Sequence, residues 1–287
     1  MQSCVVVIPV YKARMSETEL ASFRQALSVF GKSQRTVVIA TFSSLDVSRY
    51  EEEASICGVS LLFEHFPSDC FASIHSYNCM MLDPAFYGRF SGYDYILLFQ
   101  LDAWVFEDRL DEWCAKGYDY VGAPLFAPGR GDLQCARTGN GGFSLRRVDA
   151  FSKALSSCIG PFVKRPADPY ISFNKKMLYF AMLLFSGWCN AVRGFLTHWV
   201  DEDRFFSYTL LGTKYEMKVP SPQEALDFAF DMHPSVCFAL NGNCLPMGCH
   251  QWPAFYDFWK GYITSDNKPS SDFVLEQSRS KGHPPSD

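Results

Sequence analysis

The sequence predicts an α/β fold with a mostly parallel central sheet and helices on both of its faces. In roughly the first 125 residues, apolar runs of strand length alternate with segments of helical apolar spacing. These runs are apolar throughout, which is typical of parallel strands covered on both sides. The chain has 287 residues, 48% of them hydrophobic, so it can enclose such a core and disorder over most of its length is excluded.

Five buried strands are predicted from β-branched or aromatic runs that end in turn-forming residues. They cover residues 5–10, 36–41, 59–64, 95–101 and 118–123. A helix is predicted over residues 16–30, where Ser16 and Glu19 have the spacing of a capping box. A second helix is predicted from Ser73 to residue 82, since Pro84 follows.

The pattern changes after about residue 125, where Gly, Asn and aromatic residues dominate. We predict a helical insertion at about 153–196 and a short helix at 223–228. Residues 177–189 are the most apolar stretch, but 13 residues are too few to span a bilayer. A buried helix is therefore predicted there, with a membrane-facing ridge as the alternative because basic residues precede it. Residues 264–287 are rich in turn formers and are predicted to be a flexible tail.

Charge and cysteine usage indicate the compartment and exclude one class of partner. The net charge is −5 and no stripe of Lys and Arg is present, which argues against nucleic acid as a partner. The first residues lack the basic segment of a signal peptide. The 11 cysteines are scattered and mostly lie in apolar segments, which is typical of thiols in a reducing compartment. A cytoplasmic protein is predicted, with the inner face of the membrane as an alternative site.

The fourth predicted strand leads into Gln100-Leu101-Asp102. A carboxylate at the end of a buried strand is costly unless something pairs with it. Mg²⁺ or Mn²⁺ is a suitable partner, because hard cations take oxygen ligands and can bridge to phosphates. The alternative is that Asp102 caps the following turn or pairs with an arginine.

A glycine-rich loop, Gly139-Asn140-Gly141-Gly142, precedes a short apolar alternation. Glycines around an asparagine permit positive φ and a close approach of backbone to a ligand. We predict a substrate-binding loop on the acceptor side, with Arg146 beside it. A plain turn is the alternative.

Two further segments carry chemistry. Glu202 and Asp203 lie among aromatic residues, a setting that suits a general base; acids at a helix start are the alternative, as we predict for Glu107 and Asp108. His250 follows Cys249 in a loop bounded by Gly and Pro. A zinc site with Cys244 and a nucleophilic Cys249 are alternatives there, although the paired spacing of a strong zinc site is missing.

Four motifs in order, QLDAW, GNGGFSLRR, EDRFF and GCHQWP, resemble a bacterial family of unknown function related to glycosyltransferases of the GT-A fold. The resemblance covers about residues 5–262. It implies a single GT-A-like, Rossmann-like domain over residues 1–263, with a nucleotide-binding half at about 1–125 and an acceptor-side half at about 126–263.

The resemblance also implies roles for residues that match GT-A motifs. Asp102 matches the acid that holds a divalent metal, Mn²⁺ or Mg²⁺, on the donor diphosphate, and His250 matches a second metal ligand near the end of the domain. Asp203 matches the base of inverting enzymes, with Glu202 as its neighbour. The residues implied to bind the donor are Pro9, Val10, Tyr11, Ser73, Tyr77, Asn78 and Gln100. Lys260 is a further candidate for a contact with the donor phosphates. Asn140, Gly141, Gly142 and Arg146 are expected on the acceptor side.

The predicted function is inverting, metal-assisted transfer of a sugar from a nucleoside-diphosphate donor to a hydroxyl of a glycan, in assembly of a surface polysaccharide or another glycan. A lipid-linked acceptor would bring a peripheral membrane contact. Two alternatives remain. Gln100 in place of the first acid of the motif favours an inactive module that binds sugar nucleotides or glycans. A hydrolase of nucleotide sugars would use the same cleft with water as the acceptor.

Overall fold

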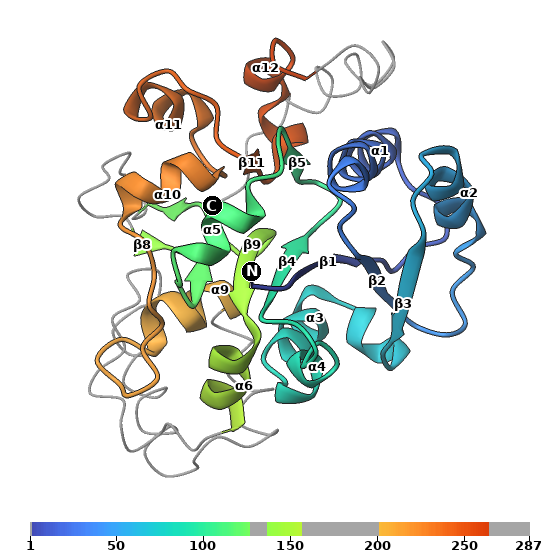
Figure 1. The fold of residues 1–287 in the computed structure, drawn as a ribbon, viewed down its shortest axis with the longest axis horizontal. Coiled ribbons are helices and arrows are strands. Elements are labelled where there is room, and N and C mark those ends of the chain that lie inside the picture. The colour runs from blue at the N-terminus through green and yellow to red at the C-terminus, as the bar shows by residue number, and fades with distance from the viewer. Residues whose placement is uncertain (1, 127–136, 157–200, 264–287) are drawn as a thin grey trace, which may run out of the picture.

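The computed structural model describes residues 2–126, 137–156 and 201–263. Its centre is a six-stranded sheet in the order β3-β2-β1-β4-β9-β6 (Figure 1). The first four strands of that order run parallel, and β9 runs antiparallel to both β4 and β6. The strands are β1 (Cys4–Pro9), β2 (Val37–Thr41), β3 (Leu61–His65), β4 (Tyr95–Phe99), β6 (Tyr120–Val121) and β9 (Phe143–Arg147). The predicted α/β fold with a mostly parallel sheet is confirmed.

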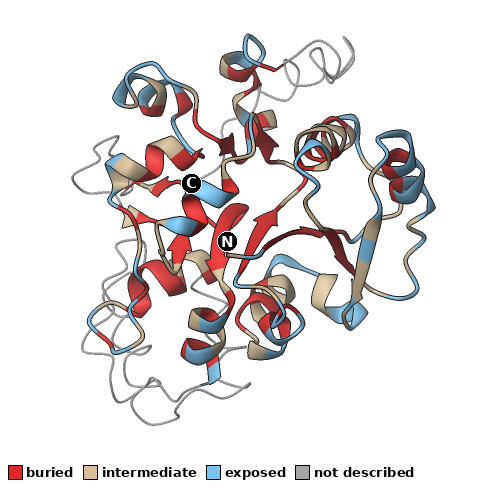
Figure 2. Ribbon diagram, viewed as in Figure 1, coloured by how far each residue is buried: buried red, intermediate tan, exposed pale blue. Residues whose placement is uncertain are grey.

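Helices cover both faces of this sheet, because alternate strand residues point to opposite sides. One face packs against α1 (Glu17–Lys32), α2 (Ser48–Ile56) and α5 (Leu110–Ala115). The other packs against α3 (Ile74–Met81), α4 (Pro84–Gly88) and α6 (Val148–Ser156). Figure 2 shows the central strands buried between these layers. The predicted capping box at the start of α1 is present.

Three details differ from the sequence prediction. The third strand, β3, is not buried on both faces: it forms the edge of the sheet, and Leu62 is 53% exposed. Helix α2 is an element that apolar spacing did not predict, because only Tyr50 and Ala54 face the hydrophobic core. The last predicted strand is reduced to the two residues of β6, which pairs with β9 and not with β4.

A second, three-stranded sheet lies beside the first. Its order is β10 (Ala229–Phe230), β11 (Gly248–Cys249) and β5 (Trp104–Val105), with β11 parallel to β10 and antiparallel to β5. A third hydrophobic cluster, with three buried tryptophans, surrounds it. The remaining elements are η1 (Ser68–Phe71), β7 (Pro124–Leu125), β8 (Arg137–Thr138), α9 (Glu202–Arg204), η4 (Phe205–Thr209), α10 (Pro222–Phe228), α11 (Pro234–Leu240), η5 (Trp252–Phe255) and α12 (Tyr256–Trp259).

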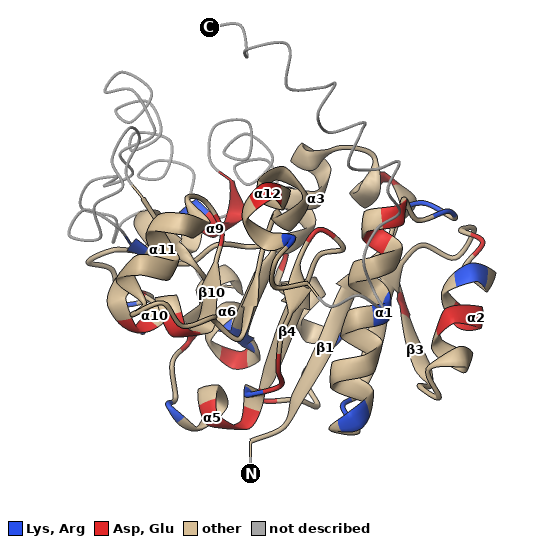
Figure 3. Ribbon diagram, turned by 90° about the horizontal axis from the view of Figure 1, so that it is seen from above, with Lys and Arg blue, Asp and Glu red and all other residues tan. Residues whose placement is uncertain are grey.

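Most of the predicted helical insertion, including residues 177–189, and the predicted tail lie outside the described residues. Among the residues that are described, no helix combines the length and the apolar character needed to cross a membrane. Lys and Arg residues of this part are spread over several elements (Figure 3).

The parallel strands β1, β2 and β4 end at one edge of the central sheet. In Figure 3, β1 begins near the N-terminus at the lower edge of the view, and α3, α9 and α12 lie toward the opposite edge. In open α/β sheets, ligands bind beyond the carboxyl ends of the strands. A binding site is therefore expected where β1 and β4 end.

Candidate active site

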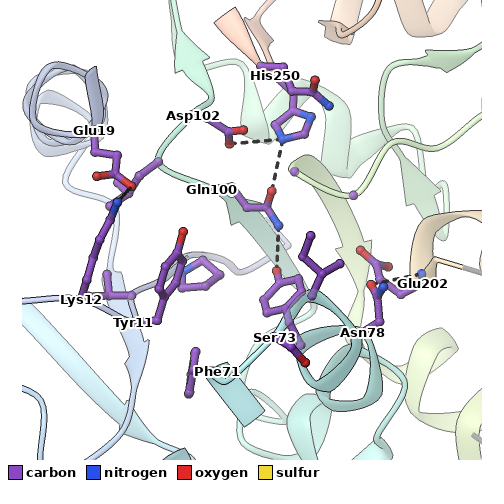
Figure 4. A pocket seen from close by; sticks show the side chains of 18 of the residues that line it. Tyr11, Lys12, Glu19, Phe71, Ser73, Asn78, Gln100, Asp102, Glu202 and His250 are labelled. Carbon is purple, nitrogen blue, oxygen red and sulfur yellow. Dashed lines mark hydrogen bonds and ion pairs between the residues drawn. The ribbon is translucent and has the colours of Figure 1, made fainter. Parts of the chain in front are cut away.

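A cavity of about 870 Å³ opens at this edge of the sheet, and it is lined by residues from β1, α3, α9, the glycine-rich loop and the segments that follow β4 and β11 (Figure 4). Every residue that the sequence assigned to the site lines the cavity, except Arg146 and Lys260. Its walls are Pro9, Val10, Tyr11, Lys12, Ser16, Thr18, Glu19, Tyr50, Phe71, Ala72, Ser73, Ile74, Tyr77, Asn78, Gln100, Leu101, Asp102, Asn140, Gly141, Gly142, Asp201, Glu202, Asp203, His250 and Gln251.

The small sheet brings Asp102 and His250 together although 148 positions separate them. Asp102 precedes β5 and His250 follows β11, and Cys249 pairs with Trp104 in the antiparallel register. The Trp252 amide donates a hydrogen bond to the Asp102 carbonyl at 3.2 Å. His250 Nε2 lies 3.2 Å from Asp102 Oδ1. The Asp102 carboxylate thus pairs with the His250 imidazole and not with an arginine, which was one of the alternatives from the sequence.

Charge on this pair follows from its surroundings. Burial favours the neutral form of Asp102, but contact with His250 outweighs it, and the pKa of Asp102 lies below its usual value. Burial alone would lower the pKa of His250; hydrogen bonds to Asp102 and Asp231 outweigh it and raise the pKa to about 10. The imidazole is therefore positively charged at neutral pH.

Two oxygen atoms lie at the distance from His250 Nε2 that neighbouring ligands of one divalent cation need. Gln100 Oε1 lies 3.2 Å from His250 Nε2, the same distance as Asp102 Oδ1. Gln100 Nε2 donates to the Tyr77 hydroxyl at 3.1 Å, so the carbonyl oxygen of Gln100 faces the imidazole. Adjacent ligands of an octahedral cation with bonds of about 2.1 Å lie about 3.0 Å apart. The residues present therefore fit Mg²⁺ or Mn²⁺ once His250 has lost the proton on Nε2.

The alternatives built on cysteine are not supported. Cys249 is fully buried and burial raises the pKa of its thiol, whereas a nucleophile or a zinc ligand must be a thiolate. Cys244 is exposed. No group of three or more His, Cys, Asp or Glu side chains in the described ranges could hold a metal ion by itself. Oxygen atoms of Gln100 and of a bound substrate would have to complete the coordination.

The glycine-rich loop owes its glycines to close packing. Phe143 pairs with Phe99, so the loop runs beside Gln100. The backbone amide of Gln100 donates to the Gly142 carbonyl at 2.8 Å. A Cβ on Gly142 would overlap the His250 imidazole, and a Cβ on Gly141 would overlap the Glu202 carboxylate. The expectation of positive φ holds for Gly139 alone, with φ of 129°.

This packing yields a prediction for Gly142. In Gly142→Ala the added methyl group must displace the imidazole, so we expect the affinity for Mn²⁺ in the presence of a nucleoside diphosphate to fall by an order of magnitude or more. Gly92→Ala is the matched control, since nothing lies within 4 Å of a Cβ there. Equal Mn²⁺ affinities of the two variants in a calorimetric titration would contradict this account of the loop.

Arg146 does not face the cavity. Its side chain is fully buried beneath the loop, where Nη2 lies 2.8 Å from Glu202 Oε1, Nη1 donates to the Tyr87 hydroxyl at 3.0 Å and Nε donates to Ser144 Oγ at 2.9 Å. These contacts occupy its guanidinium, so the structure does not bring Arg146 to the cavity with the other residues predicted for the acceptor side. Lys260 is also outside the cavity: it is exposed after α12, and its Nζ lies 3.3 Å from Asp257.

Removing Arg146 should destabilise the fold. Arg146→Met leaves the buried Glu202 carboxylate without its counter-charge, so we expect the free energy of unfolding to fall by about 3–5 kcal/mol. The double variant Arg146→Met/Glu202→Leu should lose less, because no uncompensated charge remains. Urea unfolding measures both. A single variant within about 1 kcal/mol of the wild type would show that the pair does not hold the loop against α9.

The acidic segment at α9 is held by α3. Asn78 Nδ2 donates to Asp201 Oδ1 at 3.1 Å, and Asn78 Oδ1 accepts from the Glu202 amide at 3.4 Å. Asp203 lines the cavity. Burial and the neighbouring carboxylates of Glu202 and Asp201 raise the pKa of Asp203 to about 8. A carboxyl group with this pKa is suited to exchange a proton near neutral pH.

The second Glu-Asp-Arg segment behaves differently, as predicted. Asp108 Oδ1 accepts from the Leu110 amide at 2.9 Å at the start of α5, and Asp108 Oδ2 lies 2.7 Å from Arg35 Nε. It is a helix start, away from the cavity.

Sequence reasoning missed three features of the site. Lys12, whose Nζ lies 2.8 Å from Glu19 Oε1, forms the wall opposite α9 beside Tyr11. Phe71 adds an aromatic side chain to the same wall. Lys12 lies just beyond the end of the first predicted strand, and this position could have indicated it as a site residue. Asp231, the partner of His250 Nδ1 at 3.0 Å, follows a two-residue strand that no pattern predicts.

The chain belongs to the family described as "Protein of unknown function (DUF5672)", whose model matches residues 60–250. The predicted membership in a family of unknown function is confirmed. Pro9, Val10, Tyr11, Lys12 and Glu19 precede the matched range. None of the curated proteins compared with the chain matches it.

Several solved structures are similar to this chain at low identity. Core-mannan synthase A from Aspergillus fumigatus, in a form with Mn and GDP, is 11% identical over 76% of this chain and 72% of its own, with a TM-score of 0.48. The glycosyltransferase GlyE of Streptococcus pneumoniae is 12% identical over the whole of this chain and 66% of its own, with a TM-score of 0.48. TarS from S. aureus, in complex with UDP-GlcNAc, is 15% identical over 53% of this chain and 47% of its own, with a TM-score of 0.35. Because these TM-scores are below 0.5, the function proposed next depends on the chain's own cavity.

Proposed function

We propose that the protein is a glycosyltransferase that moves a sugar from a nucleoside-diphosphate donor to a hydroxyl of a glycan acceptor, with inversion at the anomeric carbon. One observation carries this proposal. A single cavity combines a carboxylate and an imidazole spaced for a divalent cation with a separate carboxyl group, Asp203, whose pKa is about 8.

The nucleoside part of the donor would lie over the end of β1. Tyr11, 56% exposed, and Phe71 offer aromatic surface to a nucleobase there. Ser73, Tyr77 and Asn78 from α3 would contact the sugar of the nucleoside, together with Pro9 and Val10 on the opposite side. A cavity of about 870 Å³ has the volume of a site for such a ligand.

The charge of the cavity supports a metal on the diphosphate. Lys12 is the only Lys or Arg among the described residues that line it, and it is already paired with Glu19. Asp102, Asp201 and Glu202 add three carboxylates to the walls, which outnumber the one positive charge of the His250 imidazole. A diphosphate would meet net repulsion here unless a cation accompanied it. We propose that Asp102 and His250, with the carbonyl oxygen of Gln100, hold Mn²⁺ or Mg²⁺.

When bound, the metal ion neutralises the charge that develops on the leaving diphosphate. Asp203 accepts the proton of the acceptor hydroxyl as that oxygen bonds to the anomeric carbon. The bond from the anomeric carbon to the diphosphate breaks at the same time, and the diphosphate keeps the electron pair. Glu202, fixed by Arg146, supports the basicity of Asp203 through its charge. A single displacement of this kind inverts the anomeric configuration.

The proposal is tested by release of nucleoside diphosphate from a panel of nucleotide sugars with Mn²⁺. Release that rises at least tenfold when a glycan acceptor is added is the expected result. Equal release with and without acceptor would identify a hydrolase instead. Donor binding without any release would identify a binding module, and failure of every donor to raise the melting temperature would overturn the proposed ligand class.

A further inference from the structure

We propose that Asp231 is a positioning residue of the metal site: its carboxylate sets the ring orientation and the tautomer of His250 and couples the glycine-rich loop to that histidine. The inference rests on the proposed function, since it concerns the same cation site. Asp231 itself does not line the cavity, so it acts through His250 and has no contact with substrate.

The small sheet determines this arrangement. Asp231 follows β10 and His250 follows β11, and these two strands run parallel with Phe230 beside Cys249. The His250 amide donates to the Phe230 carbonyl at 2.8 Å, which fixes the backbone of the two residues relative to each other. Asp102 precedes β5 on the other side of β11. One three-stranded sheet thus aligns the metal candidate Asp102, the histidine and the buried carboxylate.

Both oxygens of the Asp231 carboxylate are engaged. Oδ1 lies 3.0 Å from His250 Nδ1, and Oδ2 accepts from Asn140 Nδ2 at 3.0 Å. The side chain is 5% exposed, so water does not compete for these contacts. A carboxylate can only accept, so it requires a proton on Nδ1. In the neutral imidazole the lone pair is then on Nε2, the nitrogen that faces Gln100 and Asp102.

The same carboxylate connects the loop to the histidine. Asn140 donates to Asp231 and accepts a hydrogen bond from the Gly142 amide at 3.0 Å. Gly142 in turn packs against the His250 ring with no room for a side chain. The loop therefore touches the imidazole directly through Gly142 and indirectly through Asn140 and Asp231. Carboxylates that orient a ligating histidine in this way typically contribute 10–100-fold to metal affinity.

The test compares Mn²⁺ binding to the wild type and to Asp231→Asn, with and without each common nucleoside diphosphate. The NH₂ group of the new asparagine would face either the NH₂ group of Asn140 or His250 Nδ1–H. In both orientations two hydrogen-bond donors meet, so one of the two wild-type contacts is lost. We expect Mn²⁺ affinity to fall 10–100-fold while metal-free nucleotide binding stays unchanged. Asp227→Asn is the control for loss of one charge, since Asp227 is 41% exposed and pairs with Arg109.

A double variant and an NMR measurement on the wild type keep the inference testable if Asp231→Asn does not fold. In the double variant Asp231→Asn/Asn140→Asp, the oxygen of the new asparagine can accept from His250 Nδ1–H and its amide can donate to the new aspartate. Mn²⁺ affinity should therefore recover to within tenfold of the wild type. The second measurement is a ¹⁵N NMR spectrum of the histidine side chains of the wild type with Mg²⁺ and nucleoside diphosphate. The signals of His250 are assigned by their loss in His250→Gln. We expect the spectrum to show a proton on Nδ1 of His250.

Two results would overturn the inference while leaving the proposed function intact: Asp231→Asn that binds Mn²⁺ as tightly as the wild type, or His250 with an unprotonated Nδ1. A wild type that binds no Mn²⁺ even with nucleoside diphosphate would instead remove the proposed metal site, and the inference with it.

Discussion

Asp203→Asn is expected to lower the rate of sugar transfer by a factor of about 10²–10⁴ and to leave donor affinity unchanged. Asparagine keeps the volume and polarity of the side chain, but it cannot take the proton of the acceptor hydroxyl. The comparison is kcat with a saturating acceptor, together with donor affinity by calorimetry. Asp257→Asn, on the exposed surface of α12, is the matched control. A variant that keeps more than a tenth of the wild-type kcat would remove Asp203 from the role of base.

The pKa of Asp203 adds a pH dependence to this prediction. Because the base must be unprotonated and its pKa is about 8, wild-type kcat/KM should rise with pH and level off above about pH 8. A rate that is flat between pH 6 and 8 would contradict the assignment.

The same carboxyl group should reduce stability at alkaline pH. Its pKa is raised in the fold, so the folded state holds a proton that the unfolded chain, with a pKa of about 3.9, has already lost. Stability therefore falls as pH rises from about 4 to 8. Asp203→Asn cannot ionise and should gain on the order of 1–3 kcal/mol relative to the wild type at pH 9, and little at pH 4. Equal stabilities of the two proteins at pH 9 would show that burial does not strain this carboxylate.

Asp102→Ala is expected to abolish the metal-dependent part of donor binding, a loss of about 10²-fold in donor affinity at saturating Mn²⁺. The substitution removes the proposed oxygen ligand beyond the end of β4 and leaves His250 with Asp231 as its carboxylate partner. Calorimetric titration of the donor with Mn²⁺ and with EDTA separates the two contributions. Asp111→Ala, an exposed carboxylate on α5, is the control. If the wild type binds donor equally with and without Mn²⁺, the metal site fails.

The parts of the fold that the sequence predicted are those with local signals. Strands β1, β2 and β4 are continuous apolar runs, and α1 has both apolar spacing and a capping box. The edge strand β3 carries similar letters, but burial depends on a neighbour on its outer side, which no local pattern reveals. Helix α2 was missed because its buried face includes Glu53, fully enclosed and paired with Arg24 and Arg49.

The residues of the candidate site also divide into those with a local sequence signal and those that depend on tertiary contacts. Gln100 and Asp102 follow a predicted strand, so strand topology placed them at one edge of the sheet. The glycine-rich loop was recognised from its composition and from the apolar alternation after it. Arg146 was expected in the cavity because it lies close in sequence to the glycine-rich loop, but the structure buries it beneath that loop. Its burial depends on Glu202, 56 residues later in the sequence.

Asp231 was missed for a related reason. The two-residue strands β10 and β11 have no period to recognise, and their pairing is a tertiary event. Such short strands align Asp102, Asp231 and His250, so the chemistry of this site depends on contacts that only the folded chain contains.

The anomeric configuration of the transferred sugar tests the central claim most directly. The product is formed from a donor of known configuration and an acceptor, and the coupling constant of its anomeric proton is read by NMR. A single displacement with Asp203 as base predicts the configuration opposite to that of the donor. A product that retains the donor's configuration would exclude a single in-line displacement with Asp203 as base and would contradict the account.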